Sequence, residues 1–169
     1  MNRANLGPIA PEAPVFGACR PGHLGGDVAA WTDALADRGI DTVCCLLSDG
    51  EARRWKLPER YADSFTTAHV PIRDRHLPDP DDLRRALDVL ATATADDGAA
   101  AIHCNAGLGR TGVVAAAWLV RERDLAPEAA VVAAEDAPVP RAPREAIRDD
   151  NASEAELLDL LARVADTPR

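Results

Sequence analysis

Residues 99–112 read AAAIHCNAGLGRTG and join an expected buried strand at 99–104 to an expected helix at about 110–123. The strand is a short, continuous apolar run, which is typical of a strand covered on both faces. The turn between the two elements contains Gly107 and Gly109, which adopt backbone conformations that other residues avoid. The sequence therefore predicts a strand–turn–helix unit in this region.

Strands and helices alternate along the rest of the chain. Further strands are expected at 15–19, 41–47 and 65–72, and further helices at 27–38, at 81–97, from Pro127, and after a capping box formed by Ser153 and Glu156. The segment APVPRAP at 137–143 is expected to be a loop. This alternation predicts an α/β fold with a central, mainly parallel sheet of about four to five strands flanked by helices.

The 169 residues suit one compact domain, so we expect a single domain over 1–169 with an extended lead-in at 1–14. The net charge is −9, and a negative field repels polyanions, so neither nucleic acid nor a membrane is expected as a partner. The chain has no apolar stretch of about 18 residues and no secretory signal, so we expect a cytoplasmic location and reduced cysteines. No metal-ligand spacing is present, and neither a metal nor another cofactor is expected.

The turn after the 99–104 strand has the composition of an anion-binding site. Its backbone N–H groups can converge at a helix N-terminus, where the helix dipole adds positive potential. Cys104 opens the turn, and the positive environment favours the thiolate, which is the nucleophilic form. Arg110 closes the turn with a planar fork that can grip two phosphoryl oxygens, and the Thr111 hydroxyl can hydrogen-bond the thiolate. The turn therefore indicates nucleophilic attack on a phosphoryl group.

Residues 103–112 resemble the Cys-x5-Arg loop of the protein tyrosine and dual-specificity phosphatases, and the spacing of the chain is similar to that of the small, atypical dual-specificity branch. The resemblance implies a protein tyrosine phosphatase-like fold and a phosphomonoester hydrolase that forms a phosphocysteine intermediate, with His103 bracing the loop. It also implies a phosphorylated protein as substrate, carrying phosphotyrosine or also phosphoserine and phosphothreonine, with a small phosphometabolite or an RNA 5′-end as the alternative. The backbone groups expected to bind phosphate belong to Asn105, Ala106, Gly107, Leu108, Gly109 and Arg110.

Two other interpretations of the turn stay open. Residues 107–112, GLGRTG, also fit the GxGxxG dinucleotide fingerprint, with Glu135 or Asp136 as its acidic partner. That interpretation leaves the cysteine and the arginine unexplained, and it needs a strand at 129–136, where the pattern is more typical of a helix. A catalytically inactive module that binds phosphate is the other alternative.

Phosphoryl transfer of this kind needs an acid that protonates the leaving oxygen. Asp74 is our choice, because it follows an expected strand, precedes a Pro-containing loop and ends a P-I-x-D pattern that is frequent in the resembled family. Asp79 and Asp81 are the alternatives. The neighbouring basic residues, which form either a positive rim or an ordinary solvated surface, are Arg73, Arg75 and His76.

Three more residues are candidates for accessory roles. Cys44 and Cys45 lie on the strand expected beside the 99–104 strand, and in some members of the resembled family a nearby cysteine forms a protective disulfide with the nucleophile. The simpler interpretation is that both are buried core residues. The chain contains no glutamine to position the water of a second step, and Asn151 is the candidate substitute.

Overall fold

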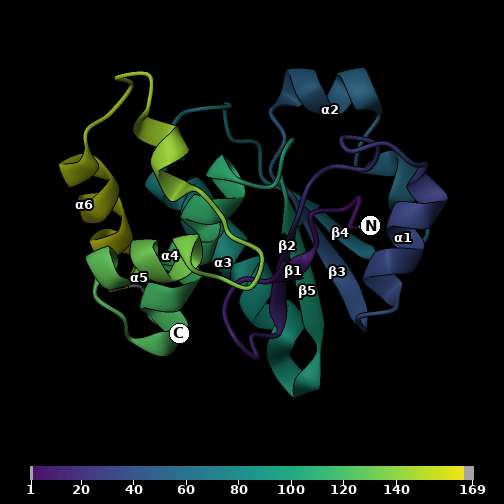
Figure 1. Ribbon diagram of the computed structural model, residues 1–169, viewed down its shortest axis with the longest axis horizontal. Coiled ribbons are helices and arrows are strands. Elements are labelled where there is room, and N and C mark those ends of the chain that lie inside the picture. The colour runs from purple at the N-terminus through teal and green to yellow at the C-terminus, as the bar shows by residue number, and fades with distance from the viewer. Residues whose placement is uncertain (1, 166–169) are drawn as a thin grey trace.

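The computed structural model describes residues 2–165 (Figure 1). Its strands are β1 Gly7–Pro8, β2 Val15–Ala18, β3 Ile40–Cys45, β4 Thr66–His69 and β5 Ala99–His103. Its helices are α1 Val28–Ala36, α2 Asp49–Trp55, α3 Pro80–Thr94, α4 Gly109–Arg123, α5 Pro127–Glu135 and α6 Glu154–Ala165, with 3₁₀ turns at Glu59–Tyr61, Ala95–Asp97 and Pro143–Ile147. The α/β class predicted from the sequence is confirmed, and β1 and α2 are the elements it did not predict.

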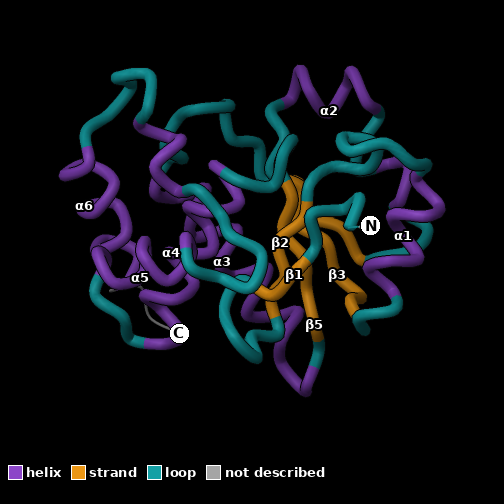
Figure 2. Tube along the Cα trace, viewed as in Figure 1, coloured by secondary structure: helices purple, strands orange, loops and turns teal. Residues whose placement is uncertain are grey.

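The five strands form one mainly parallel sheet, as predicted. Figure 2 shows the strands gathered between the helices. Their order is β1-β2-β5-β3-β4, in which β2, β5, β3 and β4 are parallel and β1 pairs antiparallel with β2 at one edge. Pro8 of β1 has no N–H to donate, and proline in a sheet is confined to such edge positions. The expected lead-in at 1–14 therefore supplies an edge strand, and Ile9 behind it is fully buried.

Helices cover both faces of the sheet. Figure 1 shows α1 on one side of the strands and α3 to α6 on the other. Successive side chains of β3 alternate between the two sides, because strand residues point alternately to opposite faces. Cys44 packs in the larger apolar cluster with α3 to α6, whereas Val43 and Cys45 pack in the smaller cluster with Trp31 of α1.

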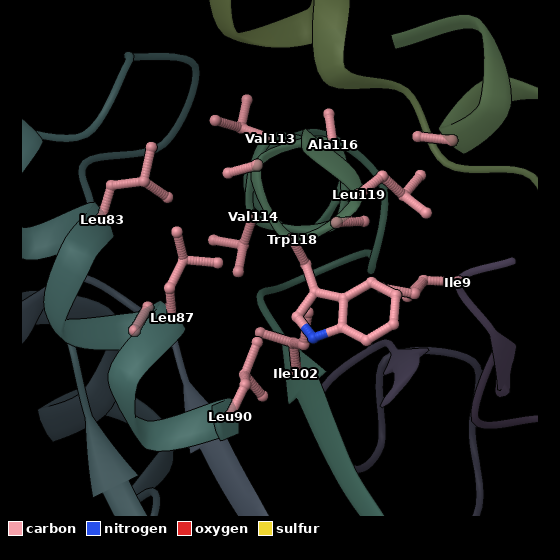
Figure 3. Packing of buried hydrophobic residues seen from close by; sticks show 14 of the residues in the cluster. Ile9, Leu83, Leu87, Leu90, Ile102, Val113, Val114, Ala116, Trp118 and Leu119 are labelled. Carbon is pink, nitrogen blue, oxygen red and sulfur yellow. The ribbon is translucent and has the colours of Figure 1, made fainter. Parts of the chain in front are cut away.

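The helix α4 is enclosed by the other elements of the larger cluster. All of its residues from 110 to 121 are buried, and Figure 3 shows side chains of α3, β5 and the N-terminal segment gathered around it. Leu83 and Leu87 of α3 are both almost fully buried in this contact. Tertiary packing of this kind holds a helix in place more strongly than its intrinsic propensity. The start of α4 therefore has a fixed position at the end of β5.

The carboxyl ends of the four parallel strands meet at one edge of the sheet. The segments that leave this edge are the turn after β2, the helix α2 after β3, residues 70–76 after β4 and the 104–110 loop after β5. Ligand sites of open α/β sheets lie at this edge. None of the helices within residues 2–165 is long and apolar enough to cross a membrane.

Candidate active site

The 104–110 loop connects β5 to α4, as the sequence predicted. Gly107 has a φ of 80°, and a Cβ atom on it would lie 2.6 Å from the carbonyl oxygen of Ala18, so only glycine fits here. Cys104 is 3% exposed, and its Sγ accepts a hydrogen bond of 3.2 Å from Oγ1 of Thr111. The sulfur therefore lies beside the N-terminus of α4, the positive end of the helix dipole.

Arg110 lies at the start of α4 with its side chain 1% exposed. Its Nη1 and Nη2 donate to the two carboxylate oxygens of Glu51 at 2.6 and 3.0 Å, and Nη1 also donates to the carbonyl oxygen of Ile72 at 2.9 Å. An oxygen of Asp74 lies 3.4 Å from Nη2. Burial acts to lower the pKa of Arg110, but the hydrogen bonds to Glu51 and the charge of Cys104 outweigh it and raise that pKa. The buried Nε of Arg110 has no hydrogen-bond partner within the described part of the chain, so this donor is available to a phosphoryl oxygen.

Glu51 is a site residue that the sequence analysis missed, together with the helix α2 that carries it. Ser48 and Glu51 form a reciprocal capping box, in which Ser48 Oγ accepts from the Glu51 N–H at 3.3 Å and Glu51 Oε2 accepts from the Ser48 N–H at 2.9 Å. Burial acts to raise the pKa of Glu51, but hydrogen bonds from Arg110 and Ser48 hold it below its ordinary value. One ionised carboxylate thus caps α2 and orients Arg110. The Ser-x-x-Glu spacing was the signal for the helix.

The three candidate acids lie in different environments. Asp74 approaches Arg110, and its side chain is 58% exposed. Asp79 instead caps α3, since its side chain accepts a hydrogen bond of 2.9 Å from the Asp81 N–H. Asp81 pairs with Arg84 at 3.1 Å on the surface of α3. The structure therefore brings Asp74 to the site arginine and leaves the other two at the start of α3.

His103 lies beneath the loop and is fully buried. Its Nδ1 is 2.9 Å from the carbonyl oxygen of Cys104, and its Nε2 is 2.7 Å from Oη of Tyr61. A carbonyl oxygen can only accept, so Nδ1 carries the proton and Nε2 accepts from the tyrosine hydroxyl. Burial lowers the pKa of His103 to about 4, so the ring is neutral at neutral pH. The ring therefore connects the Cys104 backbone to the aromatic cluster that contains Trp31 and Tyr61.

Arg141 is the second residue of the site that the sequence analysis missed. It is 2% exposed, and its guanidinium donates to the carbonyl oxygens of Gly107 at 2.8 Å, Gly17 at 2.9 Å and Gly7 at 3.4 Å. Burial lowers its pKa to about 10, so it is still charged at neutral pH. Arg141 lies in the segment 137–143, which the sequence predicted only as a loop, and no local pattern reveals contacts of this kind.

The other predicted residues lie around this centre. Cys44 and Cys45 are fully buried on opposite faces of β3, and burial raises their pKa values to about 12 and about 11. Both are therefore un-ionised core thiols, and a disulfide with the nucleophile stays a prediction. Asn151 Nδ2 donates to the carbonyl oxygen of Arg75 at 2.9 Å, so it ties down the segment after Asp74.

Two of the open interpretations can be compared with the fold. The dinucleotide interpretation needs a strand at 129–136, but these residues lie in and at the end of α5, Pro127–Glu135. Arg73 and Arg75 are exposed, so the positive rim stays a prediction. Within residues 2–165, no group of three or more His, Cys, Asp or Glu side chains is placed to hold a metal ion.

Comparisons with known proteins agree with this geometry. A family model described as the DSP-PTPase phosphatase of polymorphic toxin systems matches residues 17–124. Cyclin-dependent kinase inhibitor 3 of Rattus norvegicus is 31% identical over 107 residues, which are 59% of this chain and 50% of that protein. The Mus musculus protein of the same name is 28% identical over 106 residues, 49% of its length. The chain thus spans about half the length of the curated relatives it matches.

Solved structures show the same fold. The active form of Tk-PTP superposes with a TM-score of 0.71 at 21% identity and covers 97% of this chain and 98% of its own. A kinase associated phosphatase, solved with a serine in place of its catalytic-site cysteine, gives a TM-score of 0.69 at 23% identity, with 91% and 89% covered. These likenesses concern the fold, and the family model, which spans more than half of the chain, gives the family. The chain belongs to the DSP-PTPase phosphatase family of polymorphic toxin systems, and thus to the cysteine-dependent phosphatases that the sequence motif predicted.

Proposed function

We propose that this chain hydrolyses phosphomonoesters with Cys104 as the nucleophile, Arg110 as the phosphate clamp and Asp74 as the general acid. The observation that carries the proposal is the Sγ of Cys104, hydrogen-bonded to Thr111 at 3.2 Å inside the loop that Arg110 closes. The backbone N–H groups of residues 105–110 would bind the phosphoryl oxygens, and His103 would brace the loop from below. A single phosphatase domain over 1–169 is part of the proposal, since both apolar clusters pack on one sheet.

The reaction proceeds in two displacements. The Cys104 thiolate attacks phosphorus in line, and the bond from phosphorus to the leaving oxygen breaks while protonated Asp74 gives that oxygen its proton. The arginine and the loop amides hold the other three oxygens as their charge changes. Water then attacks the phosphocysteine, Asp74 takes a proton from it, and inorganic phosphate leaves with the thiolate restored.

The proposed substrate is a phosphorylated protein that carries phosphotyrosine, and a shallow pocket, if present, would admit phosphoserine and phosphothreonine as well. Asn105 and Leu108 carry no positive charge into the loop, which suits a phosphoprotein better than a highly charged phosphoinositide. A net charge of −9 disfavours nucleic acid, and a cytoplasmic location belongs to the same proposal. Relative rates on a panel of phosphopeptides, phosphometabolites and 5′-phosphorylated RNA rank these classes directly.

The catalytic assignment is tested by turnover of aryl phosphates in EDTA. Cys104→Ser and Arg110→Ala are expected to abolish measurable turnover. Asp74→Asn is expected to lower kcat by about 10²- to 10⁴-fold on a substrate with a poorly acidic leaving group, and by less on one whose leaving group departs without a proton. Full activity of Cys104→Ser would overturn the proposal.

The matched control for the acid is Asp79→Asn. Asn is as good a helix cap as Asp, so this variant keeps the cap of α3 and is expected to keep wild-type kcat on both substrates. If Asp79→Asn shows the leaving-group-dependent loss and Asp74→Asn does not, the acid is Asp79 and the assignment to Asp74 is wrong.

A further inference from the structure

Hydrogen bonds to carbonyl oxygens fix the direction of the peptides in the 104–110 loop. Each carbonyl group from residue 104 to residue 108 accepts a hydrogen bond of 2.8–3.1 Å. A trans peptide directs its N–H opposite to its C=O, so the N–H groups of residues 105–109 all point away from these donors. In loop order the donors are His103 Nδ1, the Arg20 N–H, Asn5 Nδ2, Arg141 Nη1 and the Ala142 N–H.

Asn5 is the donor that comes from the N-terminal lead-in, before residue 17, where the match to the family model begins. Its Nδ2 donates to the carbonyl oxygen of Ala106 at 3.1 Å. The same peptide carries the N–H of Gly107, and Arg141 holds the following peptide through the Gly107 carbonyl oxygen at 2.8 Å. Glycine permits many backbone conformations, so the two peptides that flank Gly107 gain a fixed direction from these two donors.

The turn that carries Asn5 is itself held in place. Asn2 Oδ1 accepts from the Leu6 N–H, and Asn2 Nδ2 donates to the Leu6 carbonyl oxygen, both at 2.9 Å. The carbonyl oxygen of Ala4 accepts from the Cys19 N–H at 2.7 Å, which joins the turn to the segment after β2. Asn5 has a φ of 48°, in the left-handed region that asparagine adopts more readily than most residues. The local fold therefore presents the Asn5 amide to the loop at a defined position.

We infer that Asn5 is a positioning residue of the phosphatase, which holds the Ala106 peptide so that the Gly107 N–H faces the bound phosphoryl group. The inference rests on the proposed function and deepens it, because it names a residue of the lead-in that acts on phosphate through the loop. A peptide in this orientation offers a donor to the anion, whereas the reverse orientation offers a carbonyl oxygen and repels it. Asn5 thus favours the loop conformation that stabilises the phosphoryl oxygens in the ground state and in the transition state.

The test removes the Asn5 amide without straining the turn. Asn5→Gly keeps a residue that adopts positive φ readily, and Asn5→Asp keeps the shape but places an acceptor against the Ala106 oxygen. Binding of inorganic phosphate is measured by calorimetry in the Cys104→Ser background, and kcat/KM on an aryl phosphate is measured in the active background. In Asn5→Gly we expect the phosphate Kd to rise and kcat/KM to fall, each by about 3- to 10-fold, the value of one hydrogen bond. Asn5→Asp is expected to lose at least as much.

The matched control is Glu12→Gly, which also replaces a residue of the lead-in that has positive φ. Glu12 has a φ of 62° and is exposed, and it precedes the amino end of β2, whereas the loop lies at the carboxyl ends of the strands. Glu12→Gly is expected to keep the wild-type phosphate Kd and kcat/KM. All variants are measured below the onset of thermal unfolding, so a loss of stability alone changes neither quantity.

The outcomes separate positioning from a purely structural role. Wild-type phosphate Kd and kcat/KM in either Asn5→Gly or Asn5→Asp would overturn the inference, because Asn5 would then only tie down the lead-in. Equal losses in Asn5→Gly and Glu12→Gly would overturn it as well. Absence of wild-type turnover on every aryl phosphate would instead contradict the proposed function, and the phosphate titrations in the Cys104→Ser background would still decide the role of Asn5.

Discussion

Two buried arginines contact the 104–110 loop region, and their partners differ. Arg110 bonds the carboxylate of Glu51 and approaches Asp74. Within residues 2–165, the hydrogen-bond partners of Arg141 are all carbonyl oxygens, contributed by Gly107, Gly17 and Gly7, and the Nε of each arginine is buried without a partner. Arg110 is bonded by carboxylates and suits a site that binds an anion, whereas Arg141 joins three backbone segments.

The difference separates a working cation from a structural one. A carboxylate partner orients a guanidinium while leaving donors for a phosphoryl group, so Arg110 suits a clamp. Carbonyl oxygens bring no negative charge, and Arg141 therefore keeps its full charge near the loop. Burial lowers the pKa of Arg141, and the charge of Cys104 acts in the opposite direction.

The largest effect on stability is expected when Arg141 is replaced. Arg141→Met keeps the apolar bulk but leaves the carbonyl oxygens of Gly107 and Gly17 buried without their donor, so the free energy of unfolding is expected to fall by about 3–5 kcal/mol. Urea denaturation measures this loss. Arg144→Met, three residues on, removes only partly exposed ion pairs with Glu135 and Glu154 and is expected to cost less than about 1 kcal/mol. Equal losses in the two variants would show that Arg141 is not a structural cation.

The neutral histidine beneath the loop predicts a smaller effect that depends on pH. Burial depresses the pKa of His103 from 6.5 to about 4, so the unfolded chain binds a proton that the folded chain excludes between these values. Stability from this residue is therefore complete above pH 6.5 and is lost as the pH falls toward 4, by about 3 kcal/mol in all. Urea denaturation at several pH values should show this loss in the wild type and not in His103→Gln, while His76→Gln keeps it. A wild-type slope that His103→Gln leaves intact would contradict this.

Local patterns were sufficient for most of the fold. The strand at β5, the turn and α4 were predicted because an apolar run, two glycines and a helical segment follow one another within 25 residues. The capping box at Ser153 and Glu156 was also read correctly, and both of its reciprocal hydrogen bonds are present. The same spacing at Ser48 and Glu51 was overlooked, and with it the whole of α2. The strand β1 could not be predicted from local patterns, since its two residues are too few to show an alternating pattern.

The contacts that complete the site are long-range, and sequence patterns do not report them. Glu51 is 59 positions from Arg110, and Arg141 is 34 positions from Gly107. A capping box explains why a glutamate stands at position 51, but not that its oxygens also face an arginine of another helix. Asp79 is a case that the sequence does settle in retrospect, because an Asp followed by proline is a helix start. Its role as a cap leaves Asp74 as the one of the three candidate acids that approaches Arg110.

The smallest effect is expected at Glu51, which acts through Arg110 as a positioning residue. Gln at this position still completes the capping box with Ser48, so Glu51→Gln should leave α2 in place while it removes the charge that orients the guanidinium. We expect kcat on an aryl phosphate to fall about 10- to 100-fold, the cost of a misplaced catalytic group, and inhibition by inorganic phosphate to weaken, because both require a correctly aimed Arg110. Asp49→Asn, in the first turn of the same helix, is the control and should change neither quantity. If Glu51→Gln keeps the wild-type kcat and phosphate inhibition, Glu51 serves only as a helix cap. The carboxylate that distinguishes Arg110 from Arg141 would then be that of Asp74.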